Sequence, residues 1–219
     1  MKFYPHPRPP GAIFQAATAI CKRLGNQAQA VFRVALWSLL LAGISAPAMA
    51  DFDVDALLRV LARQPTGRAA FTEKKFLPLL YRPLESSGEL VYLAPGHLEK
   101  NTLKPRLESL ILDRDGLTLK REGLAQPLRP PDHPDAAAFI DSLGGAWAGD
   151  RAGLERRWRL SVQGSAAAWT LVLLPTAADR AAVSRIDIAG EAGQVRSVAL
   201  WQANGARSLL ALAPFAAKP

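Results

Sequence analysis

The chain has 219 residues, of which 49% are hydrophobic and 21% charged, and this composition excludes a disordered or collagen-like protein. Its formal net charge is +8, but the first 50 residues hold five of the 27 Lys and Arg residues and no acid, so residues 51–219 carry only +3 (22 basic against 19 acidic residues). This small excess argues against a nucleic-acid-binding domain, whose basic footprint would track phosphates.

Residues 1–50 have the organisation of a secretory signal peptide. A basic stretch ending at Arg33 is followed by an apolar run over residues 34–44 and by the triplet Ala48-Met49-Ala50. The run is shorter than the roughly 20 residues of a membrane-spanning helix. We therefore predict cleavage after Ala50 and an exported domain over residues 51–219. A start codon assigned too far upstream would explain the long basic stretch equally well.

The only cysteine, Cys21, lies inside the predicted signal peptide. The predicted mature domain therefore has no disulfide, no thiol nucleophile and no acylated cysteine of its own. Its stability must come from an ordinary hydrophobic core, for which residues 51–219 are long enough to form one domain.

Two short helices are predicted from apolar residues at positions i, i+3, i+4 and i+7. The first lies between Asp51 and Pro65, and the second begins at Pro134-Asp135 and ends at Gly144-Gly145. The apolar positions are Val54, Leu57, Leu58 and Leu61 in the first helix, and Ala136, Phe139, Ile140 and Leu143 in the second. Each helix is one-sided and needs a surface to cover.

Elsewhere the apolar period is two, which is typical of strands. Strands are expected near residues 68–81, 89–94, 97–103, 107–113, 117–122, 155–163, 167–174, 183–190, 194–202 and 207–213. Asp115-Gly116 predicts a two-residue type I′ turn that sets Leu112 opposite Leu119. Short strands without long crossovers predict a mostly β fold, an antiparallel meander curved around short helices. The periodicity alone favours a filled sandwich or barrel core without a cavity.

No catalytic or metal-binding motif is present in residues 51–219. His97 and Glu99 share a strand face, where a two-ligand site is conceivable but a solvated strand edge is expected. The carboxylates Glu73, Glu85 and Glu108 are expected at scattered polar strand positions. We therefore predict no enzymatic activity, no metal and no cofactor.

Four basic residues surround Trp158. They are Arg151, Arg156, Arg157 and Arg159. They could contact anionic lipid head groups or acidic proteins, but a solvated, alternating strand face is the expected reading.

Four segments resemble, in order and spacing, the periplasmic outer-membrane lipoprotein carriers of the LolA-like family. They are Phe71-Thr72-Glu73, Ser86-Ser87-Gly88-Glu89-Leu90, Ala94-Pro95-Gly96-His97-Leu98 and the run from Leu110 to Leu119. The resemblance is clearest over residues 52–122. It implies a curved, incomplete antiparallel β-barrel capped by α-helices, whose apolar interior holds acyl chains during transit between the inner and outer membranes.

The implied cargo is a lipoprotein or a related acylated lipid, and the implied partners are an inner-membrane donor complex and an outer-membrane acceptor. By alternation and apolar character, the cavity lining is expected to include Leu90, Tyr92, Leu112, Leu119, Trp158, Leu160, Trp169, Leu171, Ile186 and Ile188. Phe139, Ile140 and Leu143 are the candidate lid. We expect a monomer that does not bind nucleic acid.

The chain departs from the family pattern at two places. Ala94 stands where family members commonly have an Arg that helps to hold the lid, and Lys120 and Arg121 stand where they tend to have aromatic residues. The cargo is therefore open between a lipoprotein and another lipid or glycolipid. An exported enzyme acting on lipid or polysaccharide, and an envelope assembly module that binds another protein by strand addition, are the alternatives.

Overall fold

The computed structural model describes residues 52–63, 66–94, 96–177, 181–214 and 216–217. The predicted signal peptide, its cleavage site, Cys21, Pro65 and Pro95 lie outside these residues. Within the described part of the chain, no helix has both the length and the hydropathy needed to cross a bilayer.

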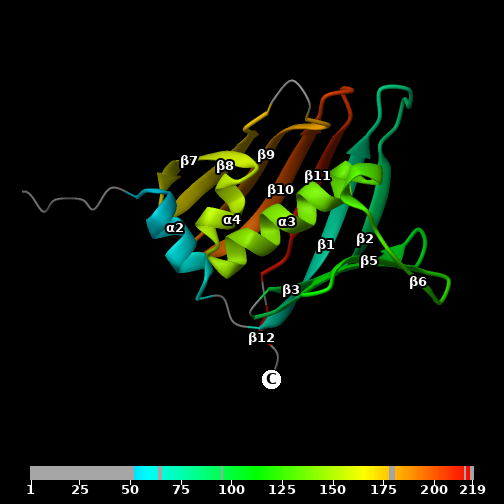
Figure 1. Ribbon diagram of the computed structural model, residues 1–219, viewed down its shortest axis with the longest axis horizontal. Coiled ribbons are helices and arrows are strands. Elements are labelled where there is room, and N and C mark those ends of the chain that lie inside the picture. The colour runs from blue at the N-terminus through cyan, green and yellow to red at the C-terminus, as the bar shows by residue number, and fades with distance from the viewer. Residues whose placement is uncertain (1–51, 64–65, 95, 178–180, 215, 218–219) are drawn as a thin grey trace, which may run out of the picture. The chain divides into compact units, whose positions relative to one another are not determined.

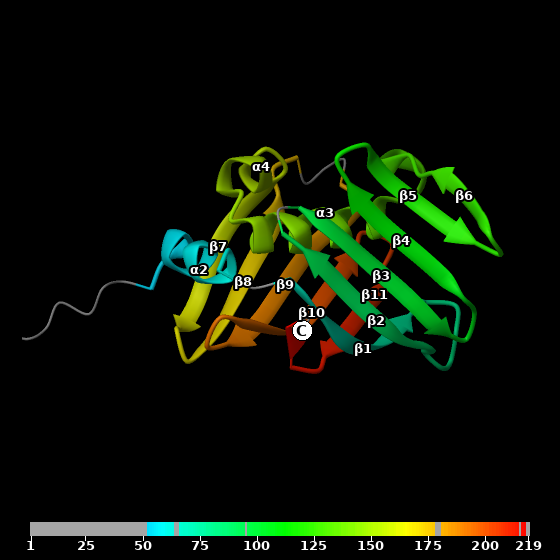
Figure 2. The same cartoon turned by 90° about the horizontal axis from the view of Figure 1, so that it is seen from below.

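The strands form one antiparallel sheet (Figures 1 and 2). They are β1 (Gly67–Phe76), β2 (Leu84–Leu93), β3 (His97–Lys104), β4 (Glu108–Asp113), β5 (Gly116–Arg121), β6 (Leu124–Pro127), β7 (Trp158–Ser165), β8 (Ala168–Pro175), β9 (Val183–Glu191), β10 (Gln194–Gln202), β11 (Arg207–Leu212) and β12 (Ala216–Ala217). Their order is β6-β5-β4-β3-β2-β1-β11-β10-β9-β8-β7, with β12 beside β1. Because β6 and β7 end this order without pairing to each other, the described sheet is curved but not closed, as predicted.

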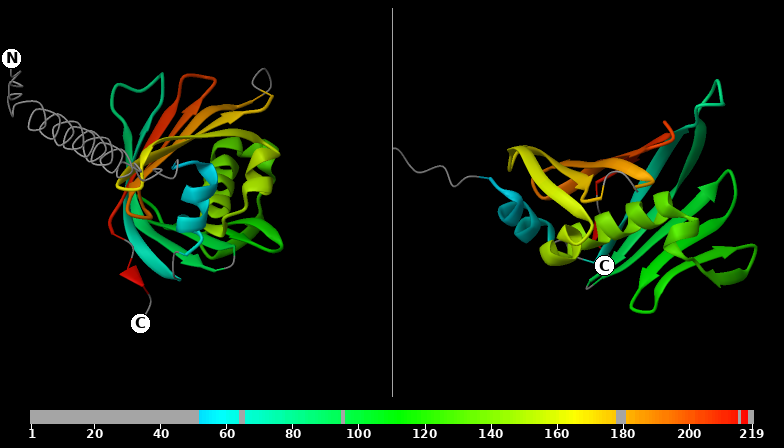
Figure 3. Two further views of the ribbon diagram at one scale, coloured as in Figure 1. Left: turned by 90° about the vertical axis from the view of Figure 1, so that its left-hand side faces the viewer. Right: turned by 45° about the horizontal axis from the view of Figure 1, so that its top comes forward.

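The helices connect the two free edges of the sheet. After β6 the chain passes through a 3₁₀ turn, η2 (Pro130–Asp132), and then α3 (Pro134–Ala148) and α4 (Arg151–Glu155) before it enters β7. This crossing places α3 against the concave face, in contact with β3, β4, β9 and β10. Figure 3 shows the sheet curving around α3 and α4, with α2 (Val54–Leu61) beside them.

The first predicted helix is confirmed as α2. The Asp53 carboxylate caps it by accepting a hydrogen bond from the Ala56 N–H at 2.8 Å. Its apolar positions Leu57, Leu58 and Leu61 are buried, as their spacing predicted. The helix therefore packs its apolar side into the interior of the domain.

The second predicted helix continues past its expected end. Gly144 and Gly145 lie inside α3, which ends at Gly149 in the left-handed region, with φ 67°. A Cβ at Gly144 would lie 3.1 Å from Leu112, and one at Gly145 would lie 2.9 Å from Leu154. The two glycines are therefore sites of close packing, and the prediction that they end the helix was wrong.

The register predicted for the β4–β5 hairpin was also wrong. Asp113 pairs with Gly116, so the turn is Arg114-Asp115 and Leu112 faces Leu117 instead of Leu119. The Asp113 carboxylate accepts a hydrogen bond from the Asp115 N–H at 2.9 Å, which stabilises this turn. Among described residues other than glycine, only Glu122 and Ala192 have positive φ, so Asp115 lacks the φ that a type I′ turn requires.

Candidate functional site

The residues predicted to line a lipid cavity lie on the concave face, where most of them form a packed core. Leu90, Tyr92, Leu119, Trp158, Trp169, Leu171, Ile186 and Ile188 are buried in one cluster, with Leu112 and Leu160 partly buried against it. Phe139, Ile140 and Leu143 of α3 are buried in the same cluster. Over this part of the sheet the helices fill the concave face.

The inward face of β1 changes character along the strand. Ala69 and Phe71 are buried in the apolar core, whereas Glu73 and Lys75, which follow at the same alternation, line a cavity of about 540 Å³. This volume lies within the roughly 300 to 1,000 Å³ of small-molecule sites. Of the predicted lining and lid residues, Leu119 and Phe139 border this cavity.

One part of the cavity wall is apolar. It is formed by side chains from β2, β4, β5, β10, α3 and the segment after β6, namely Leu84, Leu110, Leu119, Leu128, Ala136, Phe139, Val198 and Leu200. Aliphatic side chains from six segments therefore converge on one space, as an acyl chain would require.

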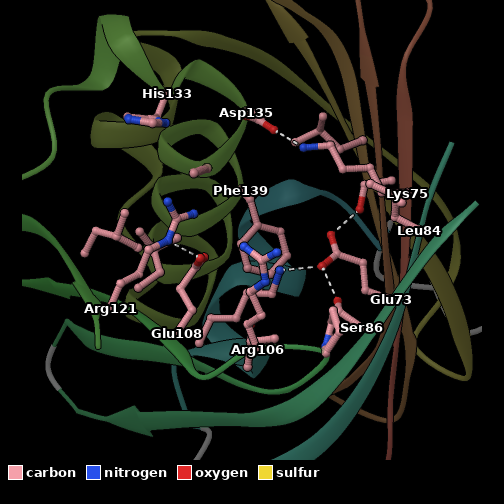
Figure 4. A pocket seen from close by; sticks show the side chains of 18 of the residues that line it. Glu73, Lys75, Leu84, Ser86, Arg106, Glu108, Arg121, His133, Asp135 and Phe139 are labelled. Carbon is pink, nitrogen blue, oxygen red and sulfur yellow. Dashed lines mark hydrogen bonds and ion pairs between the residues drawn. The ribbon is translucent and has the colours of Figure 1, made fainter. Parts of the chain in front are cut away.

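The other part of the wall is charged and hydrogen-bonded, with Glu73 at its centre (Figure 4). The Lys100 ammonium donates to the Glu73 carboxylate at 2.5 Å, and the hydroxyls of Ser86 and Ser208 donate to it as well. The same ammonium lies 5.2 Å from the centroid of the Phe71 ring and 5.3 Å from that of Phe139. Lys100 thus links the charged wall to the candidate lid.

Burial would by itself raise the pKa of the Glu73 carboxyl. The positive charge of Lys100 and the hydrogen bonds from Lys100, Ser208 and Ser86 outweigh burial, so that this pKa lies below its usual value. Glu73 is therefore ionised at neutral pH and presents a negative charge inside the domain.

A polar latch joins α3 to the sheet. Lys75 on β1 donates to Asp135 in the first turn of α3 at 2.6 Å, and the Gln202 amide donates to the same carboxylate at 3.3 Å. Burial raises the pKa of Asp135, but its hydrogen bond and charge interaction with Lys75, together with hydrogen bonds from the backbone N–H groups of Ala136 and Asp135, lower it more, so that the net pKa is below the usual value. Although Ala94 replaces the Arg that family members commonly have, α3 therefore keeps a polar contact with the sheet.

The three candidate carboxylates are not scattered. Glu73, Glu85 and Glu108 all border the cavity, and Glu108 accepts a hydrogen bond from Arg121 at 2.6 Å. The sequence carried a usable signal, because the alternation Ala69, Phe71, Glu73 places Glu73 on the inward face. Because Glu73 is charged, we expected it on the solvent face of its strand and not on the inward face.

The remaining candidates have structural contacts. The His97 Nε2 and Glu99 Oε1 atoms are 2.9 Å apart on β3. We expected these residues at a solvated edge of the sheet, but β3 is an inner strand between β2 and β4. No group of three metal-ligating side chains occurs among the described residues.

The basic cluster near Trp158 is not the alternating strand face that the sequence suggested. Arg151 binds Asp55 at 2.5 Å and Arg157 binds Asp141 at 2.5 Å, so both residues tie the helical segments together. Of the four arginines only Arg159 lies on a strand, β7.

Residues 45–218 match the family described as outer membrane lipoprotein carrier protein LolA-like. The chain belongs to this family. No curated protein matches it. The resemblance inferred over residues 52–122 is thus confirmed and extended through the second half of this LolA-like chain, where the sequence signal had faded.

Several solved structures are similar to the LolA-like chain. The LolA superfamily protein NE2245 from Nitrosomonas europaea shares 10% identity, with 76% of this chain and 94% of that chain covered and a TM-score of 0.43. LprF from Mycobacterium bovis shares 12% identity over 76% and 94% of the two chains, with a TM-score of 0.34. A putative outer membrane lipoprotein-sorting protein domain from Vibrio parahaemolyticus shares 9% identity over 76% and 92%, with a TM-score of 0.32.

Proposed function

We propose that this LolA-like chain is a periplasmic carrier that binds the acyl chain of a lipoprotein or related lipid and transfers it between the inner and outer membranes. The observation that supports this proposal is the two-sided cavity, in which Phe139 and Leu119 face an apolar space while Glu73 and Lys100 offer charge at its wall. An amphiphile has the matching division between an acyl chain and a polar head group. The role proposed is binding and not catalysis.

We expect opening of the domain to give an acyl chain more apolar surface than the cavity presents in this structure. Displacement of α3 from the concave face would expose the predicted lining residues, such as Leu171, Ile186 and Ile188, which are fully buried in this structure. Burying a chain of about fifteen methylenes gives on the order of 12 kcal/mol, which would make release into water very slow. Closing α3 over the core again offsets part of that gain and favours unloading.

The charged wall of the cavity indicates which kind of head group the cargo has. At this wall the Glu73 carboxylate is an acceptor and the Lys100 ammonium is a donor. The hydroxyls of Ser86 and Ser208 donate to Glu73, and each hydroxyl oxygen can also accept a hydrogen bond. Such a wall suits a head group with both donors and acceptors, as in the glycerol and amide groups of an acylated N-terminus or in a sugar. Both a lipoprotein and a glycolipid meet this requirement.

Binding of a fluorescent fatty acid to the protein purified from cells making the full chain tests the proposal. Ala136 borders the cavity from α3, so Ala136→Phe places a ring in the cavity while Ala136→Ser is the matched control. We expect wild type and Ala136→Ser to bind the probe, and Ala136→Phe to bind it at least about tenfold more weakly. Equal binding by a folded Ala136→Phe protein would exclude this cavity, and turnover of a lipid ester by wild type would indicate an enzyme instead.

A further inference from the structure

The loop between β1 and β2 presents large apolar side chains to solvent. Leu79 is 94% exposed, Tyr81 is fully exposed and Leu80 is nearly half exposed. Within the loop the Leu80 N–H donates to the Leu77 carbonyl at 3.0 Å, and at its base the Arg207 guanidinium stacks on Phe76, 4.4 Å from the ring centroid. Three neighbouring apolar side chains held outward in this way mark an interaction surface.

This surface continues at the loop between β3 and β4, where Leu107 is 71% exposed. Because β1 and β3 run in the same direction, their following loops lie at the same end of the sheet. The bases of both loops border the cavity, through Leu84 and Glu85 in one and Pro105 and Arg106 in the other. We call the segments 77–83 and 104–107 the rim, since they adjoin the cavity.

All charged residues at the rim are basic. Arg82, Lys104 and Arg106 have no ion pair among the described residues, whereas Lys74 at the base of the first loop is paired with Glu85. Exposed apolar side chains among unpaired cations are the combination that adsorbs to anionic lipid surfaces, where the apolar groups enter the interface and the cations meet phosphates. A second copy of the chain would bring the same cations face to face.

We propose that the rim docks on the surface of an anionic phospholipid bilayer and so brings the cavity to the membrane. Leu79, Leu80 and Tyr81 enter the head-group region, and Arg82 and Lys104 bind lipid phosphates. An amphiphile then passes between the bilayer and the cavity without crossing bulk water. This inference goes beyond lipid binding, since a protein could fill its cavity without touching a membrane.

Vesicle co-sedimentation tests the docking surface. The protein purified from cells making the full chain is mixed with vesicles of phosphatidylglycerol and phosphatidylethanolamine, and separately with neutral phosphatidylcholine vesicles. We expect wild type to bind the anionic vesicles, and Leu79→Ser/Leu80→Ser/Tyr81→Ser to bind them about tenfold or more weakly. Arg82→Glu/Lys104→Glu should lose the preference for anionic over neutral vesicles. None of these five residues borders the cavity.

The control is Leu93→Ser, at the opposite end of β2 and about 30 Å from the rim along the strand, where a partly exposed leucine is also replaced. It should bind vesicles like wild type. The triple variant should still bind the fluorescent fatty acid, so that failure of docking and failure of cavity binding are distinguished. Absence of wild-type binding to anionic vesicles, or equal binding by the triple variant, overturns the proposal. Self-association of wild type that the triple variant loses, without vesicle binding, would assign the rim to a second copy.

Discussion

Glu73 gives the cavity its polar wall at a position that a simple acyl-chain pocket would leave apolar. Its side chain is 15% exposed and is neutralised by an equally buried Lys100 at 2.5 Å. Removing one member of such a pair leaves the other charge buried without a partner. The resulting loss of folding stability is larger than the stability that an exposed ion pair contributes. The pair therefore couples stability of the fold to the chemistry of the cavity.

We predict that Glu73→Gln lowers the free energy of unfolding by about 2 kcal/mol at pH 7. Because the folded-state pKa of Glu73 is lowered, its stabilisation is present above the unfolded value of about 4.3 and is lost as the pH falls through the folded-state pKa. Urea denaturation at pH 7 and pH 3.5 should show the difference from wild type shrinking at low pH. Glu85→Gln, which breaks the exposed Lys74 pair, should cost less than about 0.5 kcal/mol. A pH-independent difference would contradict this role.

The helix α3 is the element on which access to the concave face depends. It is held by burial of Ile140 and Leu143, by the Lys100 cation over Phe139, and by the Lys75 latch to Asp135. The apolar contacts were predictable from their spacing. The latch was not, because Lys75 and Asp135 are 60 residues apart and meet only once the chain has crossed the concave face between its two free edges.

Breaking the latch should make opening easier. We predict that Lys75→Met lowers stability by about 1 kcal/mol, since both side chains are only partly buried, and increases the association rate of the fluorescent fatty acid. Lys74→Met, which removes the exposed neighbour on the same strand, is the control and should leave the rate unchanged. Stopped-flow binding provides the measurement, and identical rates for Lys75→Met and wild type would show that the latch does not limit opening.

Truncating the lid should slow unloading. Phe139→Ala is expected to destabilise the closed form by about 3 kcal/mol, while the contacts of the core with an acyl chain remain. Closing of α3 then offsets less of the free energy of acyl-chain binding, so the bound probe should transfer to acceptor vesicles more slowly. The fluorescence of the buried Trp147, Trp158 and Trp169 reports the transfer. Circular dichroism verifies that the variant is folded. Unchanged or faster release would mean that α3 is ordinary core.

At the scale of the whole molecule, alternation and turn residues predicted an antiparallel meander curved around short helices, and the LolA-like resemblance implied that the barrel is incomplete. Elements whose signal is short were missed, among them β6, a four-residue edge strand with every residue exposed, and α4, a five-residue helix. The position of the cavity could not be predicted either. It depends on how far α3 fills the concave face, which alternation within a strand does not encode.

The arrangement of the predicted mature domain allows a direct check on export. We predict that the protein from the envelope fraction begins at Asp51, because Ala48-Met49-Ala50 follows the apolar run. N-terminal sequencing of that fraction provides the measurement. A product that retains residues 34–44 and sediments with membranes would refute cleavage.

Native mass spectrometry of the protein purified gently from the envelope fraction tests the central claim, that the cavity beside Glu73 and Phe139 holds an amphiphile. We predict a species heavier than the polypeptide by the mass of one acylated lipid, released on activation, in wild type and Ala136→Ser. It should be absent or strongly reduced in folded Ala136→Phe. A wild-type protein that carries no lipid, or an Ala136→Phe protein that carries as much as wild type, would contradict the account.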